Sequence, residues 1–196
     1  SLLIAYLAGS VIPAALLLLP VSELVKSFLD FVLLHLVSAR RMFRMDTREG
    51  IPAEGRSICV ISTLLGAEAD GARLEELYHA CRGEGTQLLF GLLADLPASS
   101  SSSGPEDAAL IHEASNTIDR LNRKYGQRFY LFTRGRSFDG EGYSAHERKR
   151  GALMELARLL CDKPSQLRVT GERDALGSVR YIITLDSDSR IYPGAV

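Results

Sequence analysis

Four apolar runs, separated by stretches of helical character, limit this chain to few folds. The runs cover residues 57–65, 87–93, 129–133 and 179–185. Long apolar runs without polar alternation are typical of strands in a parallel sheet that is covered on both faces. Such strands, alternating with helices, predict an α/β domain with a mainly parallel sheet and right-handed crossover connections.

The segments between the runs carry apolar residues on one helix face. These residues are Leu74, Leu77, Tyr78 and Cys81 in the first segment, Leu110, Ile111, Ala114, Ile118 and Leu121 in the second, and Leu153, Leu156, Ala157 and Leu160 in the third. Residues 99–105, rich in Ser, and residues 135–145, rich in Gly and charge, are predicted loops. Ligands of parallel sheets bind beyond the carboxyl ends of the strands, so we seek functional residues there.

The first 20 residues contain no charged side chain. Because about 20 apolar residues cross a bilayer as a helix, we expect a transmembrane helix over residues 1–20. Residues 21–45 are expected to form an amphipathic interfacial helix and a basic juxtamembrane segment. Basic residues at a membrane exit mark the cytoplasmic side, where residues 46–196 are then expected, with membrane lipid as a partner. The alternative is that residues 1–36 form two buried helices of a soluble protein.

The overall charge and the cysteines bear on partners and compartment. A formal net charge of -1 gives no support for a nucleic-acid partner. The three cysteines are widely spaced and odd in number, which favours neither a disulfide framework nor a zinc site. A reducing compartment fits this pattern best.

Asp186 and Asp188 come directly after the fourth apolar run. Residues two apart on a strand point to the same face, and two neighbouring carboxylates repel each other unless a cation lies between them. Carboxylate oxygens suit Mg²⁺ or Mn²⁺, which complete their coordination with water and substrate phosphates. The pair therefore indicates a metal and diphosphate site, although Asp-x-Asp is also common in surface turns.

A basic cluster precedes the third helical segment. It includes Lys149 and Arg150, which together with the free N–H groups of a helix start would attract phosphate. A solvated charged turn is the alternative. Asp95 and Thr63 lie near the ends of the second and first runs, where either could contact a nucleotide or simply cap a helix or turn.

Taken together, these motifs resemble a known family. They comprise Ile51-Pro52, Ser62-Thr-Leu-Leu65, Asp95, Glu147-Arg-Lys-Arg-Gly-Ala-Leu153, Tyr181-Ile-Ile-Thr-Leu-Asp-Ser-Asp-Ser-Arg190 and Pro193-Gly-Ala195. The set is similar to the glycosyltransferase domain of bacterial cyclic β-1,2-glucan synthases and, more distantly, to processive family-two synthases such as cellulose synthase. The resemblance implies a GT-A-type, Rossmann-like fold that transfers glucose from UDP-glucose to a growing β-1,2-glucan, with a divalent metal, at the bacterial inner membrane.

The resemblance also implies roles for individual residues. Asp186 and Asp188 would hold the metal and the diphosphate, Asp95 and Thr63 would line the uridine pocket, and Lys149 and Arg150 would face the donor phosphates. We expect the chain to be the donor-binding part of a longer enzyme, with the general base beyond Val196 and no catalytic base of its own.

Two other interpretations stay open. The chain has no Trp, although the family typically has one near residues 145–146 and another near residue 96. This departure allows a membrane-anchored nucleotide-binding module without catalysis. A synthase of another polysaccharide, such as a cellulose- or chitin-like one, would carry the same donor-site motifs.

Overall fold

The computed structural model describes residues 2–37, 50–66, 70–81, 85–186 and 188–191, with the backbone alone described for residues 2–8, 10–15 and 70. The chain divides into two compact units, Ser1–Arg44 and Met45–Val196.

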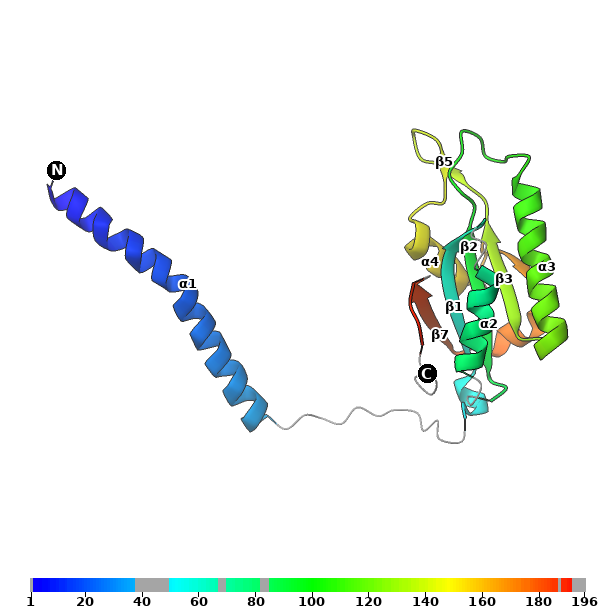
Figure 1. Ribbon diagram of the computed structural model, residues 1–196, viewed down its shortest axis with the longest axis horizontal. Coiled ribbons are helices and arrows are strands. Elements are labelled where there is room, and N and C mark those ends of the chain that lie inside the picture. The colour runs from blue at the N-terminus through cyan, green and yellow to red at the C-terminus, as the bar shows by residue number, and fades with distance from the viewer. Residues whose placement is uncertain (1, 38–49, 67–69, 82–84, 187, 192–196) are drawn as a thin grey trace. The chain divides into compact units, whose positions relative to one another are not determined.

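The first unit contains one continuous helix, α1 (Leu2–Leu36), where two separate helices were predicted (Figure 1). The helix therefore continues across residue 20, where sequence analysis placed the boundary between two segments. Within the described residues, no helix has both the length and the apolar character needed to span a bilayer, so the expected transmembrane helix over residues 1–20 is not supported. The basic juxtamembrane residues Arg40, Arg41 and Arg44 lie outside the described part of the chain.

The second unit is built on a five-stranded sheet in the order β6-β3-β2-β1-β7. The four predicted strands are confirmed as β1 (Ser57–Leu64), β2 (Leu88–Asp95), β3 (Phe129–Arg134) and β7 (Tyr181–Asp186), which are mutually parallel. A fifth strand, β6 (Arg168–Thr170), pairs antiparallel with β3 at the edge. Because β6 has only three residues and is partly exposed, it carries no long apolar run that sequence analysis could detect.

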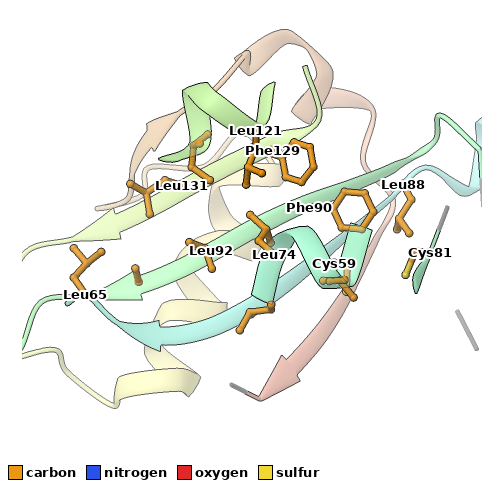
Figure 2. Packing of buried hydrophobic residues seen from close by; sticks show 14 of the residues in the cluster. Cys59, Leu65, Leu74, Cys81, Leu88, Phe90, Leu92, Leu121, Phe129 and Leu131 are labelled. Carbon is orange, nitrogen blue, oxygen red and sulfur yellow. The ribbon is translucent and has the colours of Figure 1, made fainter. Parts of the chain in front are cut away.

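Helices cover both faces of the sheet, as expected for buried parallel strands. On one face, α2 (Asp70–Ala80) and α3 (Asp107–Tyr125) pack against a core in which Phe90 stacks on Phe129 at 5.6 Å between ring centroids (Figure 2). On the other face, Ala152 and Leu156 of α4 (Arg148–Leu160) pack against Val60, Leu93 and Phe132. Two short 3-10 helices are present: η1 (Ala53–Gly55) precedes β1, and η3 (Arg173–Ser178) lies between β6 and β7 in sequence.

The order of strands reverses beside β1. From β1 the chain adds β2 and then β3 in one direction, whereas β7 lies on the other side of β1. In sheets of this type the loops on the two sides of a reversal diverge and leave a crevice at the carboxyl ends of the strands. The fold therefore places its natural ligand crevice between β1 and β7.

Residues 135–145, predicted as a loop, contain a small hairpin of β4 (Ser137–Phe138) and β5 (Tyr143–Ser144). The predicted loop at residues 99–105 meets it through a bridge between Ser99 and Tyr143. Two-residue strands leave no detectable alternation, so their pairing had no sequence signal.

Candidate functional site

The alternation of side chains along the strands brings one residue from each of three strands to the α4 face of the sheet. Ser62 near the end of β1 lies in register with Asp186 at the end of β7, and Asp95 ends β2. Each lies two or four residues after a residue of its own strand that packs on the α4 side, and therefore points to the same face. These three residues are Val60, Leu93 and Ile182. Strand geometry alone therefore directs Asp95 and Asp186 toward α4 at the carboxyl end of the sheet.

A cavity of about 400 Å³ lies at this end of the sheet, and we call it the switch-point pocket. Its lining includes Thr63, Asp95, Lys149 and Asp186, which are four of the six residues that sequence analysis selected. They come from three strands and the first turn of α4. Its volume lies within the range of small-molecule sites, roughly 300–1,000 Å³.

Lys149 and Asp186 form the polar edge of the pocket. The ammonium Nζ of Lys149 donates to Oδ1 of Asp186, and the two side chains are 38% and 64% exposed. Because the pair is open to solvent, its net contribution to stability is small. A ligand phosphate can therefore compete for the lysine, and a cation for the aspartate, at low cost.

Asp95 has a different partner, which sequence analysis did not select. Arg134, the last residue of β3, lies in register with Asp95 and binds it through Nε–Oδ1 at 2.6 Å and Nη2–Oδ2 at 3.1 Å. Both residues are 6% exposed. Since both carboxylate oxygens are occupied by one guanidinium, Asp95 acts as a fixed wall of the pocket. The sequence offered one signal for this pair: an Arg follows the third apolar run and an Asp follows the second.

Arg134 also fixes the start of α4. Its Nη2 donates to the Arg148 carbonyl at 2.6 Å. Glu147 and Arg148 have φ angles of 51° and 37°, in the left-handed region that non-glycine residues rarely adopt. A Cβ on Gly151 would lie 2.3 Å from the His146 carbonyl oxygen and 2.7 Å from Arg134 Nη1, so only glycine fits there. This tight turn brings Lys149 to the pocket.

Two predicted site residues are not brought to the pocket. Arg150 points to another cavity and pairs with Glu147 at 3.2 Å. Asp188 is exposed and lies within a turn in which the Ser189 N–H donates to the Asp186 carbonyl at 3.0 Å. Arg73 of α2 donates to the Ser189 carbonyl at 2.7 Å and so fixes this turn from the opposite face of the sheet.

Ser62 offers the pocket an additional polar group. Its hydroxyl oxygen is buried and has no hydrogen-bond partner among the described residues, although Ser62 lines the cavity. A buried hydroxyl without a partner costs free energy unless water or a ligand satisfies it.

A divalent metal is compatible with this set of residues only if the ligand contributes to its coordination. Among the described residues, no three His, Cys, Asp or Glu side chains are arranged to hold a metal ion. Asp186 is exposed enough to supply a carboxylate oxygen, and Asp188 is exposed two residues later. Mg²⁺ and Mn²⁺ are commonly bound by one or two carboxylates together with water and substrate phosphates.

The chain was also compared with known protein families and known proteins. No protein-family model matches it. The chain is 30% identical, over 188 aligned residues, to the cyclic beta-(1,2)-glucan synthase NdvB of Rhizobium meliloti (strain 1021). The alignment covers 91% of this chain but 7% of that protein, so the chain spans a small part of its relative. The predicted resemblance is confirmed, and the chain is related to a segment of a cyclic β-1,2-glucan synthase.

Proposed function

We propose that this chain, as a relative of one segment of a cyclic β-1,2-glucan synthase, forms the donor-binding part of a glucan glycosyltransferase with UDP-glucose as the donor. The switch-point pocket carries the proposal, because it brings a lysine, an aspartate and a buried hydroxyl together at the ligand-binding edge of the sheet. Transfer would extend a β-1,2-glucan, and the same donor site would also suit a synthase of another polysaccharide.

In this proposal each side chain has a distinct task. Lys149 leaves Asp186 to neutralise a phosphate oxygen of the donor. Thr63 and Asp95, which Arg134 holds in place, line the nucleoside end of the pocket, and the buried Ser62 hydroxyl gains a polar partner from the donor. Arg150 has no role in donor binding in this proposal, because it lies on another side of α4 and lines a different cavity.

Asp186 and Asp188 would hold Mg²⁺ or Mn²⁺ when the nucleotide is present. The metal would supply charge neutralisation for the leaving diphosphate. The residues of this chain bind and orient the donor, and the base that activates the acceptor hydroxyl is proposed to lie outside residues 1–196.

We also propose membrane lipid and a glucan acceptor as partners, at the bacterial inner membrane and with the α/β unit on its cytoplasmic side. Helix α1 supports a lipid contact, since its second half exposes Leu24 by 70% and Phe28 by 66%.

Titration of UDP-glucose into the full chain in the presence of Mn²⁺, measured by calorimetry, tests the donor proposal. We expect Asp186→Asn to weaken UDP-glucose binding by about tenfold, the loss of one charge-assisted contact of roughly 1.4 kcal/mol. Asp188→Asn tests the second carboxylate in the same way.

Asp119→Asn is the matched control, because Asp119 is exposed on α3 and does not line the pocket. Unchanged affinity in Asp186→Asn, or an equal loss in Asp119→Asn, would contradict the proposed role of the pocket.

A further inference from the structure

A second cavity, of about 520 Å³, lies beside the hairpin. We call it the hairpin groove and define it by six of its lining residues: Arg134, Phe138, Arg150, Met154, Arg158 and Gln166. It is formed by the end of β3, by β4, by α4 and by the segment that follows α4. The function proposed above does not use it.

The groove contains two exposed large apolar side chains among its polar lining residues. Large hydrophobic side chains that are exposed in the described part of the second unit number four: Leu64, Phe138, Met154 and Tyr181. Phe138 and Met154, which are 64% and 53% exposed, both line the groove. The Phe138 ring packs against Tyr143 with centroids 5.4 Å apart, which restricts its orientation. An exposed and oriented aromatic ring is suited to stacking on the apolar face of a flat ligand.

The charges of the groove are paired. Arg150 binds Glu147 at 3.2 Å, Arg158 binds Glu155 at 2.6 Å, and Arg134 binds the buried Asp95. Because each of these guanidinium groups has a carboxylate partner, the groove has little excess charge to attract an anion. Paired guanidinium and carboxylate groups instead offer both donors and acceptors, which suits the hydroxyl groups of a neutral ligand.

The groove adjoins the switch-point pocket through two shared features. Arg134 lines the groove and holds Asp95 in the pocket wall with Nε and Nη2. Lys149 and Arg150, consecutive in α4, line the pocket and the groove respectively. A ligand in the groove would therefore lie next to the proposed donor site.

We propose that the hairpin groove binds a stretch of neutral glucan chain, with a sugar ring stacked on Phe138 and Met154 and its hydroxyl groups bonded to the paired charges. This glucan would be the acceptor of the transfer reaction, and that assignment rests on the function proposed above. The proposal that the groove binds glucan does not depend on that function.

The test is a titration of the full chain with a β-1,2-linked glucotriose, measured by calorimetry, with UDP titrated separately. Phe138→Ala is expected to weaken glucotriose binding by about fivefold through the loss of one aromatic contact. Because Phe138 is exposed, this variant should fold and bind UDP as the wild type does. Tyr181→Ala, which removes another exposed aromatic ring at the start of β7, should leave both affinities unchanged.

Several results would overturn the proposal. One is a glucotriose affinity in Phe138→Ala equal to that of the wild type. Another is an absence of glucotriose binding in a chain that binds UDP. Competition by inorganic phosphate for glucotriose would identify an anion site instead. If glucotriose binds through Phe138 but UDP-glucose does not bind at all, the donor proposal fails while the groove stands.

Discussion

The Asp95–Arg134 pair places two full charges at positions that are 6% exposed. Removing one member of a buried ion pair is costly because the remaining charge stays buried without compensation. We therefore expect Arg134→Met to lower the free energy of unfolding by about 3–5 kcal/mol. Urea unfolding measures this loss, and Arg150→Met, which removes an exposed arginine from the same region, should cost under about 1 kcal/mol. Similar losses in the two variants would contradict the role of Arg134.

Lys149 is the cation of the switch-point pocket that faces Asp186. We expect Lys149→Met to weaken UDP binding without metal by roughly 10- to 150-fold, because a charge-assisted hydrogen bond contributes roughly 1.5–3 kcal/mol. Lys163→Met, which changes an exposed lysine beyond the end of α4, is the control and should bind UDP normally. A calorimetric titration in which both variants retain wild-type affinity would remove Lys149 from the donor site.

At the residue level, the position of a side chain is predictable where it follows from its place on a strand. Asp186 and Asp95 each end an apolar run, so the sequence alone places them at the ligand edge. Arg134 was missed because its pairing depends on the register between β2 and β3, which only the folded sheet defines. Arg150 lines a different cavity from Lys149 because adjacent helix residues point about 100° apart, and the orientation of α4 decides which one faces the pocket.

At the scale of elements, the start of α4 depends on close backbone packing. A Cβ at Gly151 would lie 2.3 Å from the His146 carbonyl oxygen, which cannot move without changing the turn at Glu147. We expect Gly151→Ala to destabilise the fold by about 1–3 kcal/mol. Gly177→Ala is the matched control, since a Cβ there meets no atom within 4 Å. Thermal unfolding that gives equal melting temperatures for the two variants would contradict this account.

The segment after β3 is joined to the start of α3 by Arg136 and Asp107. Two hydrogen bonds, at 2.6 and 2.7 Å, join the Arg136 guanidinium to the Asp107 carboxylate. They lower the pKa of Asp107, and the Gly104 N–H contributes further. A carboxyl whose pKa is lower in the folded state adds stability above its unfolded pKa, about 4, and this stability is lost as the pH falls through the folded value.

Acid should therefore weaken the wild type more than a variant without this contact. We expect the difference in stability between wild type and Arg136→Met to be largest at neutral pH and to shrink below about pH 4. Urea midpoints at pH 7 and pH 3 give the comparison. A difference that grows as the pH falls would have the wrong sign for this contact.

Element-level prediction was good for long apolar elements and poor for short ones. The strands β1, β2, β3 and β7 were found because each is a continuous apolar run. The short strands β4, β5 and β6 were missed, since two or three residues show no period. The boundary placed after residue 20 reflects a change in composition, and the helix continues across it.

At the scale of the whole molecule, the cysteines report whether the sheet is formed as described. Cys59 and Cys81 are buried in the core shared with α2 (Figure 2). Cys161, in contrast, is exposed at the end of α4. Burial also raises the pKa of the Cys59 thiol to about 12. Because the thiolate is the reactive form, we expect iodoacetamide at pH 8 to label Cys161 rapidly and Cys59 and Cys81 only after denaturation. Mass spectrometry would contradict the fold if the three cysteines reacted at the same rate.

The α/β class was predictable from the whole sequence because alternating strands and helices allow few architectures. The position of the crevice required the strand order, which no single segment contains. The central prediction is that a nucleotide binds between the ends of β1 and β7. Amide chemical shifts measured as UDP is added to the full chain test this claim most directly. We predict that the largest changes occur at Ser62, Thr63, Lys149 and Asp186, whereas changes centred on Arg73 and Arg190, or none at saturating UDP, would contradict it.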